Sequence, residues 1–337
     1  MTDAQQVVSR LVESYGVSGM EGPVRDVVRS LLPSWAHPTT DSAGNLWLVV
    51  GPGKPEVVFI AHLDEIGFEV TGIRDDGTLD LRPRGGFIAS LYEAEPALIH
   101  TGSGVVPAVF LPRDSIGRTP TRSPGAIRAD PGTGSKAATE RLGVKVGSTL
   151  TMPKSYARLV GTRATGRSFD DRVGAAALVL AVRRIDPAAL RHGVAFVWST
   201  REEIGLEGAQ AVADSLKDGP TVVLAIDTFV SSDSPLELTN FALARLGQGP
   251  VSRAVDNSSV TPPALVDSLV KLAQQRGIPF QVGATNGGND GSTFAAYGVP
   301  DAAMGWPLRY SHSPAEVIDL KDLVGLARMV EAVARSW

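Results

Sequence analysis

The sequence predicts an α/β fold in which helices flank a largely parallel sheet, with a β-barrel-like domain inserted into it. Short apolar runs rich in Val, Ile and Phe, such as 57–61 and 222–226, are typical of buried strands. They alternate with longer stretches of helical periodicity at 173–184, 263–275 and 320–336. This alternation indicates helices that cover a sheet built mainly from parallel strands.

The middle of the chain has a different pattern. From 69 to 159, short β-rich segments are separated by Gly and Pro, as at 82–86 and 131–134, and helical periodicity is confined to 135–141. We therefore predict that 1–68 and 160–337 form one α/β domain and that 69–159 is an inserted β domain. The alternative is a set of long excursions from a single sheet.

The predicted insert also suggests self-association. A β domain with exposed strand edges is prone to pair with other chains, and exposed apolar side chains favour burial against another subunit. Phe87, Ile88, Leu91 and Tyr92 are the apolar positions expected at such a contact. We therefore expect a homo-oligomer.

Composition limits the classes of function. The chain has 337 residues, of which 43% are hydrophobic, enough for a large core and more than one domain. A net charge of -4 gives no electrostatic reason to expect nucleic acid, and no apolar run is long enough to span a membrane. The N-terminus lacks the pattern of a signal peptide, and there are no cysteines. We expect a cytoplasmic protein with neither nucleic-acid nor membrane partners.

Charged side chains follow several of the apolar strands, which is a costly place for them. Glu202 and Glu203 come shortly after an apolar run that ends near Trp198, where like charges repel and lose hydration unless a cation neutralises them. The same types of residue recur beyond other apolar segments and at the start of the helix predicted near 173. These residues are His62, Asp64, Asp170, Asp227 and His312. The pattern predicts a metal site.

The number of candidate ligands favours two ions. Two histidines and three carboxylates exceed what one tetrahedral ion binds, but they suffice for two ions about 3.5–4 Å apart that share a carboxylate. Asp64 lies on the same face of an extended strand as His62, so it can fix the tautomer of that histidine. One of the adjacent pair Glu202 and Glu203 can bind metal, and the other can act as a general base.

Each residue alone also has an ordinary explanation. A His-x-Asp triplet is common, and adjacent glutamates are typical of a helix start. Asp170 and Asp227 are equally suited to capping, and His312 to a plain loop. The joint occurrence favours the metal hypothesis. For Asp171 and Arg172 we expect a structural role, in which the arginine orients nearby carboxylates.

Seven short motifs stand in the order found in one peptidase family. They occupy 16–21, 41–46, 61–68, 169–174, 202–209, 287–290 and 310–314. On these motifs, which extend over nearly the whole chain, the sequence resembles the tetrahedral aminopeptidases, a family that includes glutamyl aminopeptidases and proteins labelled endoglucanase. The resemblance implies a zinc-peptidase-like fold whose insert mediates assembly, from a dimer up to a dodecamer. It also implies that short peptides are the substrates.

The resemblance also assigns roles to individual positions. It implies two divalent ions per subunit, such as zinc, cobalt or manganese, with Asp170 as the bridging ligand. Glu202 would be the catalytic base, and Asp64 the partner that orients His62. The implied ligands of one ion are His62, Asp170 and Asp227, and those of the other are Asp170, Glu203 and His312.

Two departures from the family pattern concern specificity. Arg201 replaces the usual glutamine, and 287–292 differs from the usual Gly-Gly-Thr-Asp-Ala. A cation beside the glutamate pair is expected to lower the pKa of the pair and to change substrate preference. The function predicted is that of a dinuclear metalloaminopeptidase. The alternatives are a metal-dependent deacylase or glucanase-labelled hydrolase of the same fold, or an assembly scaffold without activity.

Overall fold

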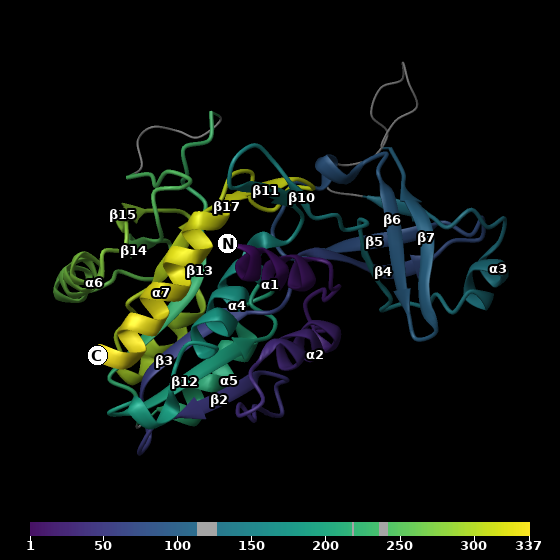
Figure 1. Cartoon of the computed structure of the whole chain (residues 1–337). Coiled ribbons are helices and arrows are strands. Elements are labelled where there is room, and N and C mark those ends of the chain that lie inside the picture. Colours follow the sequence, from purple (N-terminus) through teal and green to yellow (C-terminus); the bar gives the residue numbers. More distant parts are fainter. Residues whose placement is uncertain (113–126, 218, 236–241) are drawn as a thin grey trace.

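The structure is a computed structural model that describes residues 1–112, 127–217, 219–235 and 242–337. It has a layered α/β part and a separate β-barrel at one end (Figure 1). The predicted insert, 69–159, therefore lies partly outside the described residues. No helix in the described ranges is long and apolar enough to cross a membrane.

An eight-stranded sheet forms the centre of the α/β part. Its order is β1 (Thr39–Thr40), β2 (Leu46–Val50), β12 (Gly193–Ser199), β3 (Pro55–His62), β13 (Val222–Phe229), β16 (Met304–Pro307), β14 (Val251–Val255) and β15 (Gln281–Ala284). The central strands β12, β3, β13 and β16 are parallel to one another. At one edge, β2 runs antiparallel to β12, and β1 runs antiparallel to β2. β14 runs antiparallel to β16 and parallel to β15.

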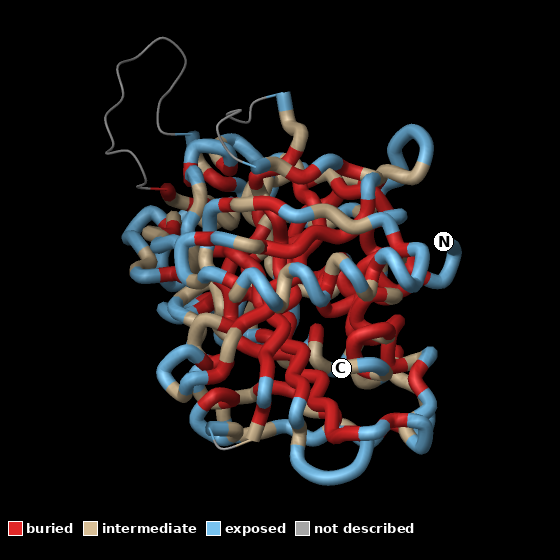
Figure 2. Tube along the Cα trace, turned by 90° about the vertical axis from the view of Figure 1, so that its left-hand side faces the viewer, coloured by how far each residue is buried: buried red, intermediate tan, exposed pale blue. Residues whose placement is uncertain are grey.

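Helices cover both faces of this sheet. On one face pack α1 (Thr2–Val12), α2 (Gly22–Leu31), α4 (Phe169–Val182) and α7 (Leu320–Ser336), and on the other α5 (Glu207–Leu216) and the 3-10 helix η3 (Asp290–Tyr297). Successive residues of β3 alternate between the two cores: Val57 and Phe59 belong to the first, Val58 and Ile60 to the second. Burial on both faces explains the continuous apolar runs of the sequence and the buried interior of Figure 2.

The predicted helices are present. Helix α6 (Pro263–Gln275) and helix α7 match the predicted ranges, whereas α4 begins four residues before the predicted 173. Asp170 and Asp171 have non-helical backbone angles at a kink, so the regular part of α4 starts close to the predicted position. The predicted α/β class, with its flanked sheet and additional β-barrel, is confirmed.

The second body is a closed barrel. Its strand order is β4 (Gly67–Ile73), β5 (Leu79–Arg84), β8 (Arg128–Asp130), β7 (Gly104–Phe110), β6 (Pro96–Thr101) and β9 (Thr149–Thr151), and β9 pairs with β4. The barrel is accompanied by α3 (Lys136–Arg141) and the 3-10 helix η1 (Ala89–Tyr92).

Closure corrects the expected subunit contact. The barrel strands pair with one another around the ring, so the exposed edges that we expected are absent from its described strands. Tyr92 is 1% exposed and belongs to the barrel core, where it packs against Phe68 and Phe110. Ile88 and Leu91 are exposed, but they line a cavity described below. Neither strand edges nor Tyr92 can therefore mediate assembly as predicted.

A small sheet connects the two bodies. It consists of β10 (Ala157–Arg158), β11 (Arg163–Gly166) and β17 (Glu316–Asp319), and it lies just before α4 and α7 in the chain. A short 3-10 helix, η2 (Pro187–Ala189), precedes β12. The chain thus returns from the barrel directly to the N-terminal end of α4, where Asp170 is located.

Candidate metal centre

Three parallel strands deliver polar side chains to the same edge of the sheet. His62 ends β3, and its register partner Ser199 ends β12, three residues before Glu202. Asp227 lies near the end of β13, which pairs with the other side of β3. Because the carboxyl ends of neighbouring parallel strands meet at one edge, residues distant in sequence come together here.

Asp170 lies between the two histidines. Its Oδ1 is 3.1 Å from His62 Nε2, and its Oδ2 is 3.2 Å from His312 Nε2. Burial alone raises the pKa of Asp170, but hydrogen bonds to both histidines lower it below its ordinary value. Each carboxylate oxygen thus faces a different ligand group, which is the arrangement of a bridging carboxylate.

Glu203 and His312 form the second half of the centre. Glu203 Oε1 lies 3.2 Å from His312 Nε2. The other ring nitrogen, His312 Nδ1, is 2.5 Å from the carbonyl oxygen of Gly86, so it carries a proton and leaves Nε2 free as a ligand atom. Gly86 is the second residue after β5, so the loop after a barrel strand orients a residue of the site.

Asp64 connects the first histidine to the glutamate pair. It is fully buried, with its Oδ1 3.5 Å from His62 Nδ1. The same carboxylate accepts hydrogen bonds from the backbone N–H groups of Glu202 and Glu203, at 3.0 and 3.2 Å, and from the Ser18 hydroxyl at 2.6 Å. Asp64 therefore holds the turn that carries the two glutamates and lies beside the His62 ring.

Glu202 points into the site without a close partner. Its Oε2 is 4.0 Å from His62 Nε2, and among the described residues its carboxylate makes no hydrogen bond and no closer ion pair. Burial raises the pKa of Glu202 well above its ordinary value, and the charges of Asp227 and Glu203 add to this effect, although His62 opposes it. Glu202 thus resembles a carboxylate kept available for proton transfer.

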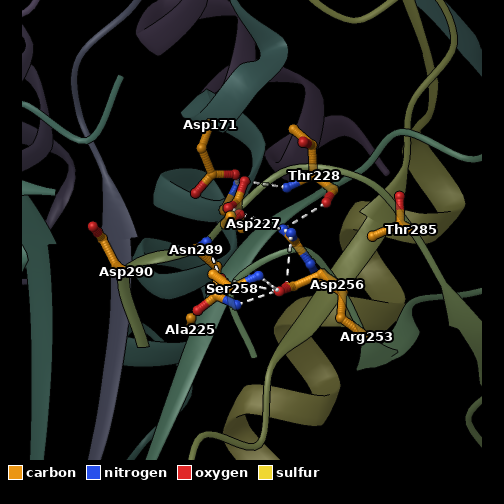
Figure 3. A network of polar contacts seen from close by, with 12 residues as sticks. Asp171, Ala225, Asp227, Thr228, Arg253, Asp256, Ser258, Thr285, Asn289 and Asp290 are labelled. Atoms are coloured by element: carbon orange, nitrogen blue, oxygen red, sulfur yellow. Dashed lines mark hydrogen bonds and ion pairs between the residues drawn. The ribbon is translucent and has the colours of Figure 1, made fainter. Parts of the chain in front are cut away.

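Asp227 is held by a network behind the site (Figure 3). Arg253 Nη1 is 2.9 Å from Asp227 Oδ2, and Arg253 Nη2 is 3.0 Å from Asp256 Oδ2. Asn289 in turn donates to Asp256 at 2.8 Å. The guanidinium also donates to the carbonyl oxygens of Thr228 and Gly288, at 2.9 and 2.8 Å. This network fixes Oδ2 of Asp227, while Oδ1 accepts a hydrogen bond from Thr228 N at 2.6 Å.

Sequence reasoning did not find Arg253 or Asp256. The available signal was a cation, Arg253, inside a short strand without another charge, β14, because a charge is rarely buried without a partner. Asn289 belongs to the stretch that departs from the family pattern. Its amide serves the Arg253–Asp256 pair, so the departure removes no candidate ligand.

The site residues fit divalent cations. Three groups have ligand atoms within 4.8 Å of one another, and two of them are the predicted sets, one with Asp227 and one with His312. We call the six residues of these groups the ligand cluster: His62, Asp170, Glu202, Glu203, Asp227 and His312. Four carboxylates face two histidines, an excess of negative charge that favours cations. Nitrogen and oxygen donors suit zinc and similar ions.

The ordinary explanations fit these residues less well. Ser168, not Asp170, is the N-cap of α4, and Asp170 has non-helical backbone angles inside it. Helix α5 begins at Glu207, so the glutamate pair lies in the preceding turn. Arg172 has the structural role that we expected: it contacts Glu65 and the carbonyl oxygen of Leu63.

Arg201 does not act on the glutamate pair as expected. Its Nε is 2.7 Å from Glu207 Oε2, and the residue has a left-handed backbone with a φ of 54°. The side chain is thereby committed to Glu207. The pKa of Glu202 is raised rather than lowered, because burial and neighbouring carboxylates dominate.

The ligand cluster opens into a cavity of about 580 Å³. Its remaining walls come from both bodies of the protein. The barrel contributes Phe87, Ile88 and Leu91, and the α/β part contributes Leu206 and Val230. A cavity of this size accommodates a small molecule or the end of a peptide.

Comparison with known proteins defines the family. The family model described as M42 glutamyl aminopeptidase matches residues 44–329, which is most of the chain. The chain therefore belongs to the M42 glutamyl aminopeptidase family. This confirms the predicted resemblance, and with it the expectation of a peptidase of the aminopeptidase type.

Individual relatives are similar to this chain over nearly its whole length. The structure is similar to that of the Pyrococcus horikoshii TET1 peptidase, with a TM-score of 0.91 and 31% identity over 99% of this chain and 100% of that one. A putative aminopeptidase, FrvX, of Escherichia coli is 29% identical over 96% of this chain and 93% of its own length. A lysyl aminopeptidase of Pyrococcus furiosus is 28% identical, with coverages of 97% and 96%.

Proposed function

We propose that this protein is a dinuclear metal-dependent aminopeptidase that removes N-terminal residues from short peptides. The observation that supports it most is the position of Asp170, whose two oxygens face His62 and His312 separately. One ion would be held by His62, Asp170 and Asp227, and the other by Asp170, Glu203 and His312. Zinc, cobalt and manganese all suit these donors.

When bound, the two ions would polarise the scissile carbonyl and lower the pKa of water. The protein's own groups would move the proton. Glu202, which has no close side-chain partner in the described structure, would accept a proton from the attacking water and return it to the leaving amine. Asp64 would keep His62 and the glutamate turn in place, since it contacts both.

The anion-rich wall also suits a free N-terminus. An α-ammonium group in a cavity of low dielectric is attracted strongly by carboxylates, so its presence can become a requirement. A blocked amine loses this charge. A β-glucanase, in contrast, needs two carboxylates free to face a sugar, whereas the carboxylates here lie against histidines and Arg253.

We further propose that 1–68 and 160–337 form the catalytic domain and that 69–159 is the insert, with a role in self-association. The similar Pyrococcus horikoshii TET1 peptidase assembles into a tetrahedron or a large octahedral shell, which supports an oligomer. Light scattering is expected to give a particle larger than the 35.4 kDa of one chain. A single species of that mass at micromolar concentration would contradict the proposal. The cytoplasmic location stays a prediction.

The test of function uses matched substrates on metal-loaded protein. An amino-acid anilide with a free amine is expected to be cleaved with zinc, cobalt or manganese, and the N-acetylated anilide to be inert. Chelation should stop cleavage, and added metal should restore it. Efficient cleavage of the acetylated substrate would favour a deacylase, and reducing sugar released from a β-glucan despite chelation would favour a glucanase. No activity with both ions bound would favour the scaffold.

A further inference from the structure

We infer that the cavity selects an uncharged, apolar N-terminal side chain and discriminates against acidic and basic ones. This inference rests on the proposed aminopeptidase function and names its substrate class. It comes from the side chains that line the cavity and from the partners that each charged group already has.

The apolar wall lies directly beside the ligand cluster. The segment that carries Phe87 and Ile88 begins at Gly86, whose carbonyl oxygen is 2.5 Å from His312 Nδ1. At the preceding Gly85, a Cβ atom would lie 3.4 Å from Glu203 Cβ. A residue whose scissile carbonyl reached the ligand cluster would therefore place its side chain near this wall.

The catalytic domain supplies matching apolar residues. Leu206 lies three residues after Glu203, and Val230 lies three residues after Asp227. Gly205, Gly287 and Gly288 have no side chains that would narrow the space. The side chain of a bound N-terminal residue would thus face apolar groups from both bodies, together with the uncharged polar residues Thr228, Asn286 and Ser311 of the same lining.

An acidic side chain would find no free cation in the described lining. Arg253 is the one Arg or Lys among these residues, and both of its Nη atoms already contact carboxylates, those of Asp227 and Asp256. Each Nη also donates to a backbone carbonyl. Its Nε is buried without a partner, so it is not presented to the cavity. Binding a carboxylate would require breaking these contacts.

A basic side chain would find no carboxylate on the apolar wall of the cavity. The acidic residues are Asp170, Glu202, Glu203 and Asp227, all of them in the ligand cluster. These carboxylates lie at the ligand cluster, where the scissile carbonyl and the α-ammonium would be bound, and not on the apolar wall that would face the side chain. A charged side chain against the apolar wall would lose hydration without compensation, which disfavours its binding.

The experiment compares four anilides on the metal-replete protein: Leu, Met, Glu and Lys. We expect kcat/KM for Leu and Met to exceed that for Glu and Lys by about 10-fold or more, within the range by which pockets discriminate side chains. Equal or higher kcat/KM for Glu or Lys would overturn the inference while leaving the aminopeptidase proposal intact. Cleavage of none of the four would overturn both.

Introducing opposite charges at one position separates a change in specificity from a general loss of activity. Ile88 is 65% exposed, so Ile88→Lys and Ile88→Glu should both fold. Ile88→Lys should raise the Glu-to-Leu ratio of kcat/KM several-fold, and Ile88→Glu should raise the Lys-to-Leu ratio similarly. Val146→Lys, at a 60% exposed position outside the cavity lining, should change neither ratio. Parallel changes in both Ile88 variants, or none, would overturn the inference.

Discussion

Two clusters of buried charge, one around Glu65 and the other the ligand cluster, are balanced in opposite ways. In the Glu65 cluster, one buried carboxylate is surrounded by Lys154, Arg167 and Arg172. Its oxygens also accept from Ser168 Oγ at 2.6 Å and from Gly16 N at 2.8 Å. The protein itself satisfies this carboxylate completely.

The ligand cluster contrasts with it. Four carboxylates and two histidines gather there, and Arg253 is the direct cationic partner of one of them, Asp227, in the described structure. The ligand cluster borders the cavity of about 580 Å³, whereas Glu65 is not among the residues that line this cavity. Buried charge by itself therefore does not identify a functional site. An excess of one sign beside a cavity does, because such an excess needs a ligand to balance it.

The largest expected effect separates the two glutamates of the ligand cluster. Glu202→Gln should keep both metals and lose about 10²–10⁴-fold in turnover, because it removes proton transfer and leaves coordination intact. Glu203→Gln should instead weaken one metal site. Metal analysis and kcat on the same samples check this. Metal loss in Glu202→Gln together with full occupancy in Glu203→Gln would reverse the two roles.

The Glu65 cluster should respond in stability instead. Glu65→Gln leaves buried cations without their shared partner, which typically costs about 3–5 kcal/mol. Denaturant unfolding measures this, and metal content should stay unchanged. Lys154→Met serves as the control and should cost less, because Glu65 keeps its contacts with both arginines. If Glu65→Gln were as stable as the wild type, the contrast between the clusters would fail.

The stability contributed by Glu65 should also depend on pH. Burial raises the pKa of Glu65, but Arg167, Lys154 and Arg172 outweigh it and hold the pKa below the usual 4.5. A lowered folded-state pKa contributes stability above the unfolded value, and this is lost as pH falls towards the folded value. The stability difference between wild type and Glu65→Gln should therefore be constant above about pH 5 and shrink at lower pH. A difference that grew with acidification would contradict the assignment.

A smaller effect, on metal affinity, is expected from Arg253, a buried cation that pairs with Asp227 of the ligand cluster. Arg253→Lys cannot make the four contacts of the guanidinium, so Asp227 should be less well held. Loss of such an orienting contact typically costs about 10–100-fold in metal affinity. Titration against a chromophoric chelator measures it, with the exposed Arg276→Lys as control. Unchanged affinity would show that Asp227 does not depend on this network.

The smallest effect is expected at Arg201, the residue that replaces the family's usual glutamine. Its exposed pair with Glu207 should contribute about 0–1 kcal/mol. Arg201→Gln should therefore leave kcat/KM for Leu anilide within about twofold and unfolding free energy within about 1 kcal/mol. A large change in substrate preference would restore the original expectation that this cation acts on the glutamate pair.

Much of the fold follows from local pattern. The helix at 263–275 and the helix at 320–336 were predicted to the residue, because their amphipathic repeats end at polar or helix-breaking residues. The β character of the 69–159 region was also readable, from its Gly and Pro spacing. Closure of the barrel was not, since it depends on long-range pairing such as that between β9 and β4. The burial of Tyr92 was missed for the same reason.

The candidate site was likewise predictable from the sequence only in part. The sequence by itself determined which residue types stand after which strands, because hydrophobic runs and costly charges are local features of the chain. Only the tertiary structure decided that Asp170 faces both histidines, that the loop after a barrel strand orients His312, and that Arg253 holds Asp227. These are contacts between segments up to 226 residues apart. No local pattern specifies them, because their geometry arises only when the sheet and the barrel are packed together.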